Sequence, residues 1–176
     1  MRGTFEIRRS WIWVSGVAIA SLLSATGVLA AGTAATAGVL GKLHQSNVKE
    51  IAMGKLAKKN GDSREVKAYG DILVKDHTAA DKKVMALARQ EKLELPAATH
   101  QMSDEMSKLT GPDFDARFAK DMLDDHKKDI DEVTQARDDT DDSRLRNLLS
   151  ELLPTLRKHE DIAQKLVDAK ATAASN

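Results

Sequence analysis

Apolar residues recur at alternating steps of four and three residues along four long segments of this chain. That spacing puts them on one side of an α-helix, and a helix with such a stripe must bury it against other helices. The chain has only three prolines, so few residues would interrupt these segments as helices. We therefore expect an all-α fold, an up-down four-helix bundle. Its helices should cover about residues 39–59, 62–92, 112–137 and 143–170.

Turn and capping residues mark the ends of these helices. Gly61 can end the first helix in the left-handed conformation, and the polar residues 62–63 can cap the second. Residues 93–112 form a long connection with room for a short helix, and Pro112 suits the first turn of the third long helix. The run DDTDDS at 138–143 offers a cap for the last helix. It lacks the glycine and the distal glutamate of an EF-hand calcium loop.

The first 30 residues have the pattern of an export signal. Three arginines precede an apolar run that ends in the small-residue sequence Val-Leu-Ala. We therefore separate a signal peptide at 1–30 from the bundle domain at 39–170 and a flexible tail at 171–176. The apolar run is also long enough for an uncleaved membrane anchor, and Arg8-Arg9 fits a twin-arginine signal. Either way we expect an extracytoplasmic protein, secreted or held in the periplasm or cell envelope.

The charge balance limits the partners of the chain. It has 27 basic and 27 acidic residues, and without residues 1–30 (three Arg, one Glu) there are 24 basic and 26 acidic residues, a net charge of −2. A nucleic-acid partner requires a basic surface, so none is expected. Cysteine is absent, which excludes disulfides, thiolate metal ligands and lipid attachment to cysteine. An alanine-rich bundle with apolar stripes is compatible with a homo-oligomer.

A polar residue interrupts the stripe of each helix. Histidine occupies such a position in the second, third and fourth helices, as His77, His126 and His159, and Glu50 lies at or next to the stripe of the first. A buried, ionised glutamate needs a cation or a hydrogen-bond donor. In the second helix the stripe consists of Val66, Gly70, Leu73, His77, Ala80, Val84 and Leu87.

Imidazole nitrogens combined with a carboxylate suit transition metals such as Zn, Cu or Fe. Asp81 and Asp129 lie about one helical turn after two of the histidines, so each could be a further ligand or an acceptor for a ligand. Asp76 and Asp125, directly before the same histidines, lie about 100° around the helix and are expected to flank the site. We therefore predict a metal site formed by Glu50, His77, His126 and His159, with Asp81 and Asp129 in reserve.

Other interpretations of the same residues stay open. The histidines could be core residues that only hydrogen-bond across the bundle and fix its register. His100, Met102 and Met106 could instead hold Cu(I) in the long connection. A ferritin-type di-iron site is not expected, because that site uses Glu-x-x-His twice and the chain lacks the tetrad. No motif identifies a catalytic residue or an organic cofactor, which leaves open whether the protein is an enzyme.

Over about residues 40–168 the chain resembles the bacterial secreted "domain of unknown function" family 4142, whose members are often labelled predicted outer-membrane proteins. The resemblance is carried by KEIAMGKLAKKNGDSREVKAYGDILVKDHTAADKKV, LPAATHQ, GPDFDARFAKDMLDDHKKDIDEV and LLPTLRKHEDIAQKL. It implies a ferritin-like bundle in the envelope and puts Glu50, His77, His126 and His159 at the family's characteristic positions. No run of about ten alternating residues suggests a transmembrane barrel.

The expected function is therefore an exported, ferritin-like bundle protein that binds a transition metal. The alternative is a non-catalytic envelope structural or stress-response protein whose core histidines only hydrogen-bond.

Overall fold

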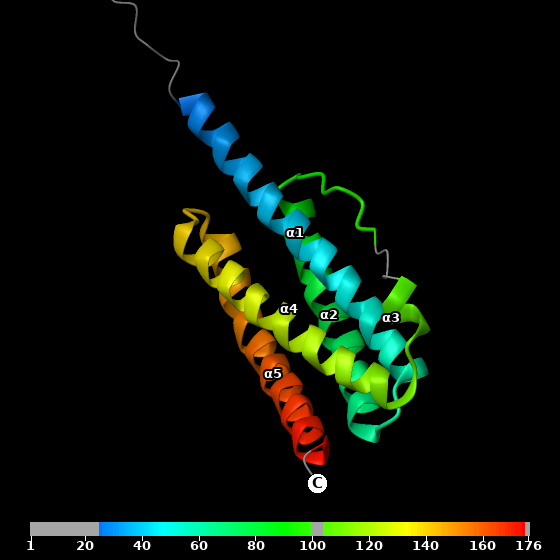
Figure 1. Cartoon of the computed structure of the whole chain (residues 1–176). Helices are drawn as coiled ribbons and strands as arrows, with labels where there is room; N and C mark the ends of the chain where they lie inside the picture. Colours follow the sequence, from blue (N-terminus) through cyan, green and yellow to red (C-terminus); the bar gives the residue numbers. More distant parts are fainter. Residues whose placement is uncertain (1–24, 100–103, 175–176) are drawn as a thin grey trace, which may run out of the picture.

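The computed structural model describes residues 25–99 and 104–174, and all regular elements in these ranges are helices (Figure 1). The expectation of an all-α protein is thus confirmed. None of the described helices is long and apolar enough to cross a membrane. The helices are α1 (Ala25–Asn60), α2 (Arg64–Gln90), α3 (Asp104–Lys108), α4 (Gly111–Asp139) and α5 (Ser143–Ala174).

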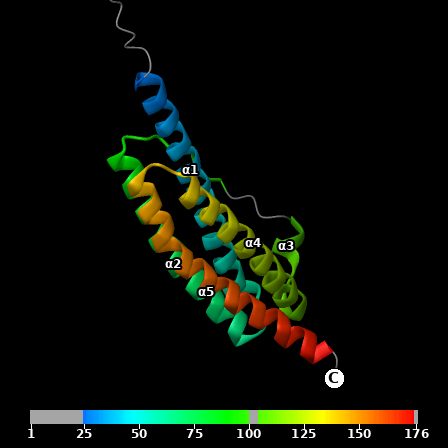
Figure 2. The same ribbon diagram turned by 90° about the vertical axis from the view of Figure 1, so that its left-hand side faces the viewer.

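The four long helices lie side by side in the order α1, α2, α5, α4 around the bundle (Figures 1 and 2). Contacts at the two ends give the direction of each helix. At one end, Thr36 of α1 donates to Asp142 in the α4–α5 turn, at 3.4 Å. At the other end, the amide of Asp62, between α1 and α2, donates to Asp115 near the start of α4, at 2.9 Å. Each long helix is therefore antiparallel to both of its neighbours.

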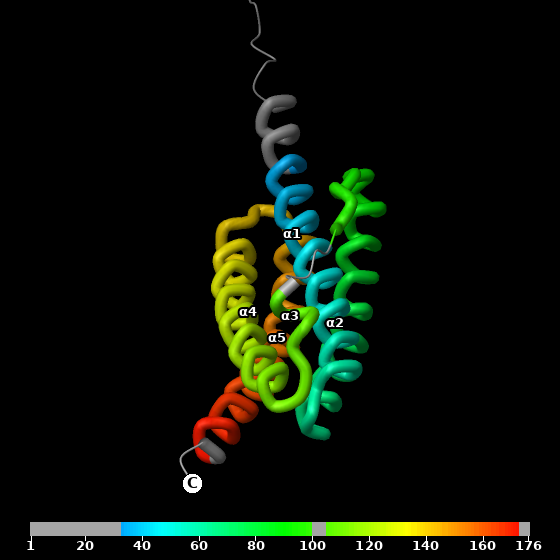
Figure 3. The backbone as a smooth tube through the Cα atoms, turned by 45° about the vertical axis from the view of Figure 1, so that its right-hand side comes forward, coloured from blue at the N-terminus to red at the C-terminus, as the bar shows by residue number. Residues whose placement is uncertain are grey.

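The long connection between α2 and α4 is present and runs the length of the bundle. Because α2 and α4 run in the same direction, the chain must return from one end to the other between them (Figure 3). It follows α1 on the way: Gln45 bonds to the backbone of Thr99, and the Asn60 amide donates to the carbonyl of Leu109 at 2.8 Å. The expected short helix in this connection is α3, a single turn.

Several helix ends differ from the sequence-based boundaries. Helix α1 begins at Ala25 rather than near residue 39; the helical segment before Val39 contains six alanines, the best helix formers, and no proline to stop the helix. The expected signal peptide lies mostly outside the described residues. Gly61 does not adopt the left-handed conformation; among the described glycines only Gly111 has a positive φ, 65°. Instead, a side chain at Gly61 would meet the carbonyl oxygen of Ala57 at 2.5 Å.

The starts of α2, α4 and α5 have the residues that the sequence predicts there. Ser63 caps α2, its side chain accepting from the Val66 amide, and Pro112 lies in the first turn of α4. Asp142 accepts from the amide of Arg144 at 2.9 Å, so the acidic run before α5 is a helix cap, as predicted. Helix α5 continues through Pro154.

A layer of polar residues divides the core into two hydrophobic clusters. One cluster surrounds Tyr69 and Phe118 near the α1–α2 turn, and the other surrounds Val84 and Leu149 near the α4–α5 turn. Between them each long helix contributes polar side chains that are at most 5% exposed. These are Asn47 and Glu50 of α1, His77 of α2, His126 of α4 and His159 of α5.

Candidate metal centre

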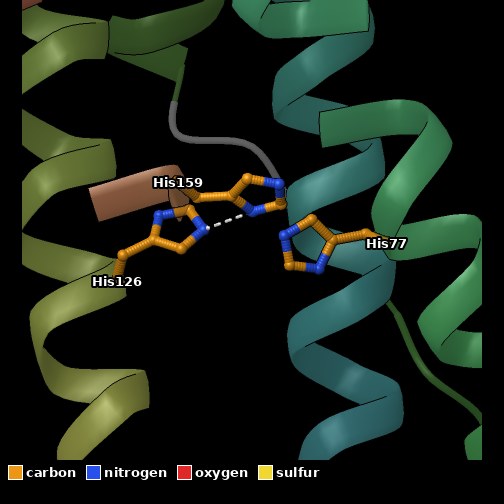
Figure 4. Close-up of side chains that lie close together, drawn as sticks. All are labelled: His77, His126 and His159. Carbon is orange, nitrogen blue, oxygen red and sulfur yellow. Dashed lines mark hydrogen bonds between the residues drawn. The ribbon is translucent and has the colours of Figure 1, made fainter. Parts of the chain in front are cut away.

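Three histidines from three helices meet in the middle of the polar layer (Figure 4). His77 is 3% exposed, and His126 and His159 are completely buried. One nitrogen from each ring can be chosen so that all three atoms lie within 4.8 Å of one another. The ring centroids are 5.1 to 5.7 Å apart. The apolar stripes thus predicted the inward position of these side chains correctly.

In each ring one nitrogen, here called the outer nitrogen, points away from the other two histidines. It faces a protein oxygen that can accept a hydrogen bond but cannot donate one. Nδ1 of His77 lies 2.9 Å from Oδ1 of Asn47, and Nδ1 of His126 lies 2.8 Å from the carbonyl oxygen of Met122. Nε2 of His159 lies 3.1 Å from Oδ2 of Asp76. None of these oxygens carries a hydrogen when Asp76 is ionised, so each outer nitrogen donates its own. This leaves the inner nitrogens of neutral rings with free lone pairs.

The inner nitrogens point toward one another. Nδ1 of His159 lies 3.3 Å from Nε2 of His126. Nε2 of His77 is buried without a hydrogen-bond partner, and Figure 4 shows it turned toward the other two rings. Three lone pairs from three helices therefore converge in the buried interior of the bundle.

Neutral rings cannot satisfy all of these contacts at once. If Nδ1 of His159 carries the hydrogen, it can donate to His126, but then the lone pair of Nε2 faces the carboxylate of Asp76. If Nε2 carries the hydrogen, the bond to Asp76 forms, but two lone pairs face each other at 3.3 Å. A cation between the inner nitrogens, or a second proton on His126 or His159, removes the conflict.

Burial disfavours the binding of a second proton to any of the three rings, because it disfavours the charged form. It lowers the pKa of His159 to about 4, although Asp76 partly offsets the effect. The pKa of His77 is well below its ordinary value because of burial first and the neighbouring histidines second. Burial also lowers the pKa of His126, despite the bond to the Met122 carbonyl. At neutral pH all three rings are therefore uncharged, the state in which imidazole binds metals.

The site contains residues that sequence reasoning did not select. Asp76 was expected only to flank His77, because it points about 100° away from it on the same helix; that direction brings it to His159 of α5 instead. Asn47 of α1 supplies the oxygen that faces Nδ1 of His77. Tyr69 donates its hydroxyl hydrogen to the backbone oxygen of His159 at 3.0 Å, which helps to fix α5 at this level.

Glu50 is buried in the same layer but is not one of the three converging groups. Its Oε2 is buried without a hydrogen-bond partner. Burial, with a smaller contribution from the charge of Asp125, raises the pKa of Glu50 to about 8. The adjacent cation, Lys49, bonds to Asp125 at 2.6 Å. Glu50 is therefore largely protonated at neutral pH.

Asp81 and Asp129, the two aspartates predicted as further ligands, form hydrogen bonds with residues other than the three histidines. Asp81 binds Nδ1 of His44 at 2.7 Å, a half-buried histidine for which the sequence gave no partner. Asp129 accepts from the Ser46 hydroxyl at 2.7 Å. Of the alternative Cu(I) group, His100 and Met102 lie outside the described residues. Met106 is 3% exposed and belongs to the hydrophobic cluster around Tyr69.

Comparisons with known proteins assign the chain to a family. No curated protein matches the chain significantly. No solved structure does so either. A family model described as "Domain of unknown function (DUF4142)" matches residues 23–166, which include α1, α2, α3, α4, most of α5 and the whole polar layer. The match covers most of the chain, so the protein belongs to the DUF4142 family.

Proposed function

We propose that this protein binds one transition-metal ion through Nε2 of His77, Nε2 of His126 and Nδ1 of His159. The proposal is supported by the different contacts of the two nitrogens in each ring. The outer nitrogen bonds to a protein oxygen, and the inner nitrogen faces the other two histidines. Metal-binding histidines in proteins have this arrangement, because the outer bond fixes both the hydrogen and the ring orientation.

The spacing of the inner nitrogens suits a small divalent ion. Tetrahedral ligands about 2.0–2.1 Å from zinc lie about 3.3–3.4 Å from one another. The 3.3 Å between His126 and His159 has this value, and the nitrogen that His77 offers lies within 4.8 Å of both. Three imidazoles suit Zn, Cu or Fe. A set of three protein ligands leaves a fourth position for water or another small ligand.

The charge of the layer agrees with this assignment. A divalent ion bound by three neutral rings keeps its positive charge, which the carboxylate of Asp76 would offset through His159. Glu50, protonated at neutral pH in the metal-free protein, is a second source of negative charge, because a nearby cation would favour its ionised form. The predicted role of Glu50 as a charge-balancing ligand therefore stays part of the proposal.

The test compares metal content between variants. Protein purified without chelators should retain stoichiometric Zn, Cu or Fe, measured by mass spectrometry, and should bind added Co²⁺ with a visible absorption band. The double variant His77→Ala/His126→Ala should lose both properties. His44→Ala is the matched control, because His44 is a half-buried histidine outside the three. Equal metal content in the wild type and the double variant would refute the proposal.

The alternative is a non-catalytic envelope structural or stress-response protein in which the histidines only connect the helices. It is supported by the hydrogen bonds that each outer nitrogen already makes within the protein. Chelation separates the two functions: EDTA should lower the melting temperature markedly if a metal is bound to the native state, and should leave it unchanged otherwise.

We also propose a ferritin-like assignment of the bundle and an extracytoplasmic location. The long connection that returns the chain between α2 and α4 supports the first, because ferritin-like bundles have one such crossover. The arginines and apolar run of residues 1–30 support the second. Fractionation of a bacterial host that expresses the full chain should place it outside the cytoplasm, and replacing Arg8 and Arg9 by Lys would identify twin-arginine export.

A further inference from the structure

A second feature of the bundle lies beside the histidine layer. A cavity of about 730 Å³ extends from the α4–α5 turn to His77 of α2 and is lined by residues of all four long helices. Its lining includes Asp76 and Asn47, the hydrogen-bond partners of two of the histidines. The cavity therefore reaches the polar layer from the outside, and its volume is within the range of small-molecule sites in proteins.

The walls of the cavity are mostly apolar. Leu145 of α5 is buried, and Leu43 of α1 is only partly covered by its neighbours. An aliphatic chain of a ligand would contact such walls and lose its exposure to water. The aliphatic lining includes Val39, Leu43, Val133, Leu145, Leu152 and Leu156.

The charged part of the lining is strongly acidic. Seven carboxylate side chains and two cations, Lys42 and Arg144, line the cavity. Arg144 is already paired with Glu91, at 2.6 Å. Glu132, Asp139 and Asp141 are exposed, so they lie where the cavity opens to solvent. An apolar pocket with an acidic rim attracts a positively charged group and repels an anion.

From this combination we infer that the cavity binds an aliphatic amine, with the alkyl chain among the leucine and valine side chains and the ammonium group at the acidic rim. The inference goes beyond metal binding and does not depend on it. It can be tested in the presence of EDTA, so its failure would be distinguishable from failure of the metal proposal.

The experiment titrates the metal-free protein with hexylamine, octylamine, octanol and octanoate by calorimetry. We expect one octylamine per chain, an affinity about threefold to fourfold higher for each added methylene, and binding of octanoate at least about tenfold weaker. Equal binding of octylamine and octanoate would overturn the inference, because the acidic rim would then have no effect. Absence of any saturable binding would overturn it as well.

Variants locate the binding site. Ala136→Phe places a ring in the cavity and should weaken octylamine binding about tenfold or more, whereas Ala116→Phe, at an exposed position of the same helix, should not. Asp139→Asn/Asp141→Asn changes only exposed residues, so it tests the rim without a risk to folding. It should weaken octylamine binding and leave octanol binding unchanged, with Asp131→Asn/Asp161→Asn as the control pair. Binding unaffected by both cavity and rim variants would show that the amine binds elsewhere.

Discussion

Nδ1 of His159 and Nε2 of His126 lie 3.3 Å apart in the bundle interior, while the other nitrogen of each ring faces a protein oxygen. Whichever nitrogen of a neutral His159 carries the hydrogen, one of its contacts is unfavourable. A metal ion between the inner nitrogens would make all the outer hydrogen bonds favourable at the same time.

Asp76 should control metal affinity without touching the metal. Asp76→Ala removes the acceptor of the Nε2 hydrogen of His159, so the metal dissociation constant should rise about 10- to 100-fold in competition with a chelating dye. Asp81→Ala is the control, because Asp81 binds His44 instead. A similar loss in Asp81→Ala would mean that Asp81 acts in the metal site after all. No loss in Asp76→Ala would mean that Asp76 does not orient the ring.

Glu50 should make the metal-free protein less stable as the pH rises. Its folded pKa of about 8 is above the ordinary value of 4.5, so the native state holds a proton that the unfolded state has lost. Stability from this group is complete below pH 4.5 and is lost as the pH rises through 8. Above pH 7 the histidines add little slope, because their folded pKa values are lowered and they are mostly neutral in both states.

Urea unfolding in EDTA between pH 7 and 8.5 measures this effect. The wild type should lose about 1–2 kcal/mol across this range, and Glu50→Gln should lose much less. Glu160→Gln, a change on the partly exposed side of α5, should keep the wild-type slope. An identical slope in Glu50→Gln would show that Glu50 is already ionised at pH 7.

The contact between α1 and α2 should tolerate no side chain at Gly54 or Gly70. A Cβ at Gly54 would lie 2.6 Å from the carbonyl oxygen of Gly70, and a Cβ at Gly70 would lie 2.6 Å from that of Gly54. Both obstacles are backbone atoms, so the helices themselves must move apart. We expect Gly54→Ala to lower the free energy of unfolding by about 1–3 kcal/mol in chemical denaturation.

The same helix supplies the control for this prediction. Gly38 is an exposed glycine of α1 with no atom within 4 Å of an added Cβ. Gly38→Ala should therefore stabilise the protein by about 0.4–1 kcal/mol, because alanine reduces the freedom of the unfolded chain. Equal effects of the two substitutions would contradict the close helix contact.

Asp115 should hold the end of the bundle together. It is fully buried and accepts from the amides of Asp62 and Ser63 and from the Lys170 ammonium group. Burial alone would raise its pKa, but these donors lower it overall. The stability it contributes is therefore present above the unfolded pKa, near 3.8, and is lost as the pH falls through the lower folded value.

Asp115→Asn should cost about 1–3 kcal/mol at pH 7, because the amide group cannot serve all three donors. The exposed Asp131→Asn of the same helix should change stability by less than about 0.5 kcal/mol. Both values can be measured by urea unfolding. A neutral result for Asp115→Asn would mean that water replaces the lost acceptor.

The sequence by itself determined which residues of each helix are buried. The spacing of four and three residues follows from the geometry of a single helix, so it predicted the buried stripe and the inward position of His77, His126 and His159. Proline and acidic capping residues likewise marked the starts of α4 and α5, since capping is a local interaction.

Only the tertiary structure decided which side chains meet. Asp76 contacts His159 and not the histidine beside it in the chain, and Asp81 and Asp129 find partners on α1. Such pairs depend on the rotation and height of one helix relative to another, which a shift of one turn would change. The state of Glu50 was decided in the same way: burial on all sides, with its neighbouring cation turned toward Asp125, leaves a carboxyl group that keeps its proton.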